Sequence, residues 1–177
     1  MNKECQIMWE EFLKESPWLT LSVPNSFNQR MESLTVGDIR NNYEYWDNFQ
    51  GYSVYRNDGE LFFIKEDVFV AYYRYSIDDE GVCHTKMTWN NKNYKGSFLK
   101  IFAEYIIPMM KAVESDDMMT PEAFSMWQKL IGHYTQYKYY IKSGDMLKPI
   151  DNPYDVHNYK EKISLNGKSN STFLVTI

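Results

Sequence analysis

The feature that most constrains the fold is a series of short alternating segments, separated by strong turn signals, between residues 52 and 89. Asp58-Gly59 lies between two apolar runs, a pattern typical of a β-hairpin. The segment Asp78–Gly81 is a second turn signal, and side chains alternate between apolar and polar on both sides of it. The predicted strands are Tyr52–Tyr55, Leu61–Ile64, Val68–Ile77 and Val82–Trp89. The sequence therefore predicts an antiparallel meander.

Helical spacing of apolar residues flanks this meander on both sides. Before it, residues 5–13 and Val36–Phe49 are predicted helices, the second with Thr35 as its N-cap. After it, Gly96 opens a helix that we expect Pro108 to end, because proline has no N–H and clashes with the preceding turn. A further helix is expected from Thr120-Pro121. The remaining expected elements are short strands at Met109–Val113 and Tyr137–Ile141, a turn at Ser143–Asp145, a loop at Pro149–Pro153 and a terminal strand at Ser171–Ile177.

These elements predict one domain, 1–177, of the α+β (mixed α/β) class, with a central, mostly antiparallel sheet and flanking helices. The 44% hydrophobic content of the 177 residues is enough for a core. Apolar runs such as Phe69–Ala71 are far too short to span a bilayer. The N-terminal residues lack the pattern of a secretory signal, and Cys5 and Cys83 form no disulfide framework. We therefore expect a cytoplasmic protein in which Cys83 is a buried structural thiol.

Charge and composition narrow the classes of partner. The net charge of −5 argues against duplex nucleic acid, which requires a concentrated basic face. The 15 tyrosines fit two interpretations, aromatic residues spread over a sheet or a protein-binding surface, and single-stranded nucleic acid remains a third class. No metal site is expected, because His84, His133 and His157 are scattered along the chain. The acidic group around Glu114 is interpreted as a solvated turn before the next helix.

The segment that follows the meander carries a resemblance to a known family. Tyr94-Lys95-Gly96, with Lys92 and Lys100 nearby, lies at the start of a predicted helix, where backbone N–H groups can hold an anion. This segment, together with the order of elements around it, resembles the GNAT family of N-acetyltransferases, whose pyrophosphate loop reads Q/R-x-x-G-x-G/A. Two positions depart from that pattern, because Asn93 replaces the leading Gln/Arg and Phe98 replaces the second small residue. The resemblance implies acetyl-coenzyme A as cofactor, held by Trp89, Asn90, Asn93, Tyr94, Lys95, Gly96, Ser97 and Phe98.

A second match lies in the helix that begins at Thr120-Pro121. Active GNAT members often have the pattern A-x-x-x-Y-x-K-L, in which the tyrosine protonates the departing thiolate. The same frame here runs from Ala123 to Leu130 and has Trp127 at the tyrosine position. The stretch is similar to phage-encoded GNAT-like proteins, which implies a place in the host cytoplasm or the virion. The resemblance covers about residues 50–141 and leaves 1–49, the N-terminal helices, and 142–177, a C-terminal extension, unmatched.

Two functions follow from this resemblance, and the sequence leaves open whether the protein is an enzyme. The favoured one is a GNAT-like protein without acetyl-transfer chemistry that binds a protein partner, in assembly or in interference with a host defence. Two altered functional positions, Phe98 and Trp127, support it. The alternative is an acetyl-coenzyme A-dependent N-acetyltransferase acting on an unidentified amine. Its candidate catalytic residues are His84 as base and Tyr134 as acid.

Overall fold

The structure is a computed structural model that describes residues 24–117, 119, 121–152, 156 and 171–177. The predicted helix at residues 5–13 lies outside the described residues. The chain divides into two compact units, 1–34 and 35–177, and each is described by itself. In the first unit the described element is helix α2 (Pro24–Ser33). None of the helices described is long and apolar enough to cross a membrane.

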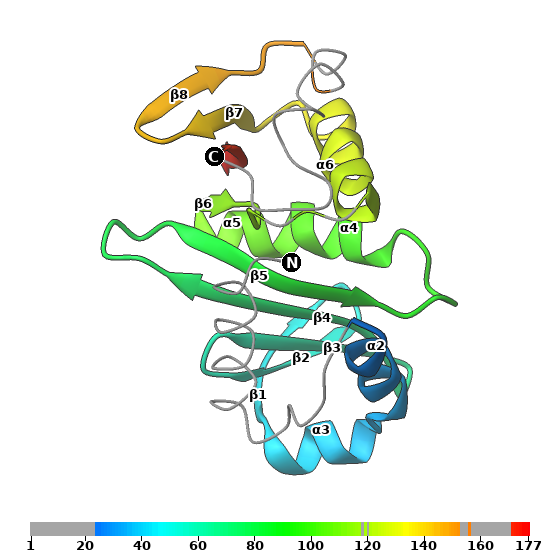
Figure 1. Cartoon of the computed structure of the whole chain (residues 1–177). Coiled ribbons are helices and arrows are strands. Elements are labelled where there is room, and N and C mark those ends of the chain that lie inside the picture. The colour runs from blue at the N-terminus through cyan, green and yellow to red at the C-terminus, as the bar shows by residue number, and fades with distance from the viewer. Residues whose placement is uncertain (1–23, 118, 120, 153–155, 157–170) are drawn as a thin grey trace. The chain divides into compact units, whose positions relative to one another are not determined.

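The second unit is built on one nine-stranded sheet in the order β1-β2-β3-β4-β5-β6-β9-β7-β8 (Figure 1). Every neighbouring pair of strands is antiparallel except β5 and β6, which are parallel. The predicted α+β class with a mostly antiparallel sheet is confirmed at this level. The strands are β1 (Glu44–Phe49), β2 (Tyr52–Asn57), β3 (Glu60–Lys65), β4 (Val68–Ile77), β5 (Cys83–Asn90), β6 (Ala112–Glu114), β7 (Lys138–Ser143), β8 (Met146–Pro149) and β9 (Ser171–Thr176).

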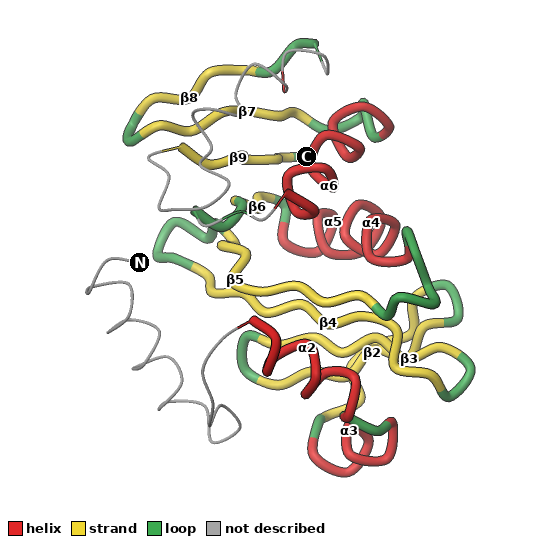
Figure 2. The backbone as a smooth tube through the Cα atoms, turned by 45° about the vertical axis from the view of Figure 1, so that its right-hand side comes forward, coloured by secondary structure: helices red, strands yellow, loops and turns green. Residues whose placement is uncertain are grey.

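Helices pack on this sheet through one continuous core (Figure 2). The segment after β5 is helical throughout and consists of α4 (Ser97–Ile101), the π-helical turn η1 (Phe102–Ile106) and α5 (Ile107–Met110). Helix α6 (Pro121–His133) follows β6. The core is formed by buried side chains of both helices and strands. The helices contribute Phe98, Ile101, Phe102, Ile106, Phe124, Trp127, Leu130 and Ile131, and the strands contribute Leu61, Phe63, Tyr73, Ile141, Phe173 and Val175.

The predicted helix Val36–Phe49 is confirmed in its first half and wrong in its second. Helix α3 (Val36–Asn42) begins as expected, because Thr35 and Asp38 form a capping box in which each side chain accepts from the other residue's backbone N–H. The helix ends at Asn42, and Glu44–Phe49 forms β1 against β2. Tyr45, Trp46 and Phe49 favour a strand, and pairing with β2 prevails over the helical spacing of the apolar positions.

The prediction that Pro108 ends its helix is also wrong, because the chain changes to π-helical hydrogen bonding before the proline. The N–H of Ile107 donates to the carbonyl of Phe102, five residues earlier. In this arrangement the acceptor that faces Pro108 is the carbonyl of Ala103, and proline has no N–H to donate. The hydroxyl of Tyr137 donates to that carbonyl over 2.7 Å instead. The helix therefore continues through Pro108 to Met110.

Replacing Tyr137 by phenylalanine tests this explanation. The substitution keeps the ring but leaves the carbonyl of Ala103, a fully buried residue, without its donor. We expect a loss of about 1–2 kcal/mol in the free energy of unfolding, because a buried acceptor is left unsatisfied. Urea unfolding followed by circular dichroism measures the effect. Tyr140→Phe is the matched control and should change stability by less than about 0.5 kcal/mol.

The remaining elements agree with the prediction in part. The meander β2–β5 and the terminal strand β9 are confirmed. The predicted strand Met109–Val113 is shorter and later, since β6 occupies Ala112–Glu114, but it is parallel as proposed. β8 was not predicted. It forms a hairpin with β7 around the expected turn at Gly144.

Candidate functional site

The candidate anion-binding loop, residues 91–96, is hydrogen-bonded to the start of β4. The backbone N–H of Asn91 donates to the carbonyl of Val70 over 2.8 Å, and its side chain donates to the carbonyl of Phe69 over 3.0 Å. Within the loop, the N–H of Asn93 donates to the side-chain oxygen of Asn91, and the N–H of Tyr94 to the Asn91 carbonyl. The backbone N–H of Asn93, the residue at the leading position of the motif, is therefore used in a hydrogen bond within the loop.

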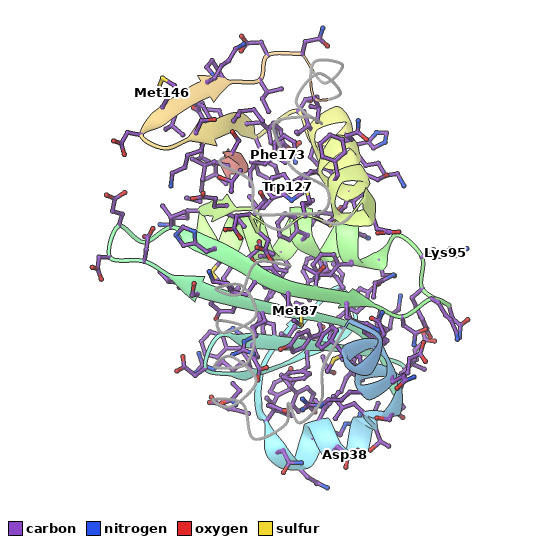
Figure 3. The ribbon with its side chains drawn as sticks, viewed as in Figure 1. Asp38, Met87, Lys95, Trp127, Met146 and Phe173 are labelled. Carbon is purple, nitrogen blue, oxygen red and sulfur yellow. The ribbon has the colours of Figure 1, made fainter. Side chains whose placement is uncertain are left out.

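Gly96 gives the loop its turn into the helix. Its φ is +83°, a left-handed conformation that glycine adopts without strain, and an added Cβ would meet no atom within 4 Å. No side chain caps the start of the helix. The N–H of Ser97 donates back to the Tyr94 carbonyl. Lys92, Lys95 and Lys100 are exposed around this turn, and Figure 3 shows Lys95 pointing away from the protein.

Phe98 does not occupy the space in front of the loop. It is only 6% exposed and belongs to the core, with its ring centroid 5.8 Å from that of Phe102 and 6.3 Å from that of Tyr73. The large side chain at the position of the second small residue therefore points into the interior. This departure from the motif leaves the outer side of Gly96 open.

The last two residues of β5 differ in their surroundings. Trp89 pairs across the strands with Tyr72 and stacks on Phe69, with ring centroids 4.8 Å apart. The Asn90 side chain donates to the carbonyls of Asn91 and Tyr94, over 3.3 and 3.0 Å. Its oxygen, Oδ1, is buried and accepts no hydrogen bond from the described residues. Asn90 thus ties the strand end to the loop.

The parallel junction between β5 and β6 is short. It comprises two residue pairs, Cys83 with Val113 and His84 with Glu114. Beyond His84, a β-bulge at Lys86 shifts the register of β5 against β4. Because of this bulge Met87 pairs with Arg74 and lies on the face opposite Thr85, contrary to simple alternation.

A polar cluster lies at this junction and joins four segments of the sheet. His84 contacts two carboxylates, with Nε2 2.7 Å from Asp78 Oδ2 and Nδ1 3.6 Å from Glu114 Oε2. Glu114 also accepts from Lys142 Nζ over 2.8 Å and from the hydroxyl of Thr172. Hydrogen bonds from His84 and from the Val82 N–H lower the pKa of Asp78, and the bond to Glu114 raises the pKa of Lys142.

The cluster corrects the interpretation of Glu114 as part of a solvated turn. Glu114 is 6% exposed and is surrounded by donors. A buried carboxylate needs such partners because desolvation alone would disfavour its charge. Sequence reasoning missed this, since Asp78, Lys142 and Thr172 are distant in the chain. Within the described part of the chain, no set of side chains is arranged to hold a metal ion.

Tyr134, the candidate acid, and Trp127, at the position where the resemblance expects a tyrosine, both have partners other than His84. The hydroxyl of Tyr134 donates to Glu104 over 3.3 Å, and desolvation, followed by that carboxylate, raises its pKa. Trp127 is 2% exposed and stacks on Phe173, with ring centroids 5.4 Å apart, while Phe102 meets its ring edge-on at 5.7 Å (Figure 3). The position of the family's catalytic tyrosine is thus part of the core.

Cys83 is the structural thiol that the sequence predicts. It is free, fully buried and 3.3 Å from the hydroxyl of Tyr73. Burial raises the pKa of its thiol to about 11, so the protonated form prevails at neutral pH. A protonated, buried thiol is a weak nucleophile.

Neither a protein-family model nor a curated protein nor a solved structure matches this chain.

Proposed function

We propose that this chain is a GNAT-like protein that does not transfer acetyl groups and acts through contacts with protein. The burial of Trp127 carries the proposal. In the frame Ala123–Leu130 it stands where a tyrosine would protonate a departing thiolate, and it is packed between Phe102 and Phe173 instead. An indole N–H is a hydrogen-bond donor and has no proton to transfer near neutral pH. Tyr134, the substitute acid, is bonded to Glu104.

The order of elements supports the GNAT-like part of this proposal. From β2 to β7 the unit runs through an antiparallel meander, a loop with Gly96 at a helix start, a parallel strand, a helix and one further strand. This is the order, over about residues 50–141, on which the family resemblance rests. β9 follows that order in the chain, and the edge strands β1 and β8 extend both ends of the sheet beyond it. Exposed hydrophobic side chains on those two strands support the protein-contact part.

An acetyl-coenzyme A-dependent N-acetyltransferase is the second candidate, and two observations favour it. Phe98 lies in the core and leaves the outer side of Gly96 open, so phosphate groups could approach the loop. His84 is held between Asp78 and Glu114, an arrangement that orients an imidazole for proton abstraction. His84 is the second residue of β5, however, and the loop follows the last, so the two are about 20 Å apart along the strand.

An assay of acetyl transfer to a panel of primary amines distinguishes the two candidate functions. The reaction is followed as release of the coenzyme A thiol. We expect no release above the rate without protein, because no acid serves the leaving thiolate. Release that depends on the amine and is lost in His84→Ala would overturn the proposal in favour of the enzyme.

Thermal unfolding in the presence of acetyl-coenzyme A shows separately whether the loop still holds the cofactor. A ligand present at 100 times its Kd stabilises the folded state by about 2.7 kcal/mol and raises Tm measurably. Adenosine diphosphate is the control for phosphate binding. If a shift occurs, Gly96→Trp should remove it, whereas Gly144→Trp, also at positive φ with no atom within 4 Å of an added Cβ, should not. A shift without thiol release fits a protein that has kept the ligand and lost the reaction.

A further inference from the structure

The two edge strands of the sheet, β1 and β8, carry most of the exposed large hydrophobic side chains of the described residues. Of six such side chains in the described residues, four lie on β1 and β8. On β1, Tyr45 is 55% and Trp46 is 44% exposed. On β8, Leu147 is 52% exposed and Met146, labelled in Figure 3, is 73% exposed. Backbone groups on the outer side of a terminal strand can pair with another strand. Among the described residues, no further strand pairs with the outer side of β1 or β8, so both ends of the sheet combine apolar side chains with an unpaired edge.

We propose that β1 of one copy pairs with β8 of a second copy, so that the sheet continues from molecule to molecule. The inference rests on the proposed protein-contact role and names the partner. The two edges have complementary charge. β1 carries two carboxylates, Glu44, which is paired with Arg56, and Asp47, which accepts from the Tyr105 hydroxyl, whereas the charged side chain of β8 is Lys148. Pairing two β1 strands or two β8 strands would bring groups of like charge to the same contact instead.

One antiparallel register matches the side chains of the two strands. It places Lys148 opposite Glu44, Leu147 opposite Tyr45 and Met146 opposite Trp46. Side chains alternate between faces, so the first and third pairs share one face and the second lies on the other. Opposite charges, an aliphatic–aromatic pair and a methionine–aromatic pair are each favourable across strands.

Contacts within the copy already hold the β1 side chains in place. The Arg56 Nε lies 3.0 Å from Glu44 Oε2, and its guanidinium carbon lies 3.5 Å from the centroid of the Trp46 ring. The ring of Tyr45 meets that of Tyr55 edge-on at 5.6 Å. Side chains ordered before contact lose less conformational entropy on binding, which favours association at this edge.

Features of both strands restrict the pairing to a short ladder. On β1, the β-bulge between Tyr45 and Asp47 in the pairing with β2 shifts the strand beyond Trp46, which makes Trp46 the last residue of the new ladder. On β8, Pro149 has no N–H to donate to a neighbouring strand. The contact is therefore small, and for an interface of this size we expect a Kd between about 10 μM and 1 mM. Each copy offers one edge of each kind, so the contact does not close on itself and open chains lengthen with concentration.

Sedimentation velocity of the full chain, at concentrations up to about 1 mM, tests the proposal with one blocked variant for each edge. Tyr45→Asp blocks β1 and Leu147→Asp blocks β8, and both side chains are more than half exposed, so the fold should persist. The wild type should sediment faster as concentration rises, whereas each variant alone should remain monomeric. Mixed in equal amounts, the two variants should form a dimer and nothing larger, because each retains the edge that the other has lost. Ile77→Asp, which removes a side chain of 56% exposure away from both edge strands, should assemble like the wild type.

Two results would overturn the proposal: a wild type that stays monomeric throughout, or a Leu147→Asp variant that dimerises by itself. The first would exclude self-association, and the second would identify β1 as pairing with its own copy. Neither result bears on acetyl transfer, which is measured separately, so the failure of one proposal leaves the other standing.

Discussion

Replacing Trp127 by alanine is expected to lower the free energy of unfolding by about 3–5 kcal/mol. The indole is among the largest fully buried side chains of the described residues, and it joins helix α6 to η1 through Phe102 and to β9 through Phe173. Its removal leaves a cavity among rigid aromatic rings, which cannot collapse to fill it. Equilibrium unfolding in urea measures the loss, and the slope of the transition should stay unchanged.

Trp46→Ala is the matched control for this prediction. Trp46 is 44% exposed and rests under the guanidinium of Arg56, so its loss should cost about 1 kcal/mol or less. Similar losses for the two tryptophans would mean that Trp127 is not in the core. The burial of Trp127, on which the proposed function rests, would then be absent in solution.

Gly59→Ala is expected to destabilise the protein by about 3 kcal/mol or more, the second large effect. Gly59 has φ of +69°, and an added Cβ would lie 2.6 Å from the backbone carbonyl oxygen of Tyr75. That distance is too short for any side chain, and the neighbouring backbone is fixed by the hydrogen bond from the Tyr75 N–H to the Gly59 carbonyl, 2.8 Å. The hairpin and β4 would have to separate.

Gly51→Ala separates the steric clash from the conformational strain. Gly51 has φ of +83°, but no atom lies within 4 Å of an added Cβ. Only the strain of a left-handed alanine remains, about 1–2 kcal/mol. The difference between the two midpoints of thermal unfolding reports the clash alone. Equal shifts in Tm would show that the contact between Gly59 and Tyr75 is absent in solution.

The meander was predictable because its signals are local. Asp58-Gly59 sets a two-residue turn, and alternating side chains assign Val68–Ile77 to a strand with its observed bounds. The capping box at Thr35 could be read in the same way. Strand β8 and the continuation of the helix through Pro108 could not be predicted, because both depend on contacts with other segments. β8 forms by pairing with β7, and the helix uses a hydrogen bond from the hydroxyl of Tyr137.

The candidate site shows the same division between local and distant information. The loop with Gly96 was visible in the sequence, because glycine and lysine before a helix are a local pattern. The direction of Phe98 was not, since its place in the core depends on Tyr73 and Phe102. The polar cluster was also hidden: Glu114 obtains its donors from Lys142 and Thr172, and the latter is 58 residues away.

The position of β9 in the sheet has a consequence for the order of folding. β9 lies between β6 and β7 but follows both in the chain, whereas β2–β5 pair only with their neighbours in sequence. Closing a long loop costs more entropy than closing a hairpin. The meander can therefore form before β9 pairs with β6 and β7. During synthesis on a ribosome, the facing edges of β6 and β7 and the side of α6 that packs on Phe173 would then stay uncovered until β9 emerges. That interval is when a chaperone would have most to protect.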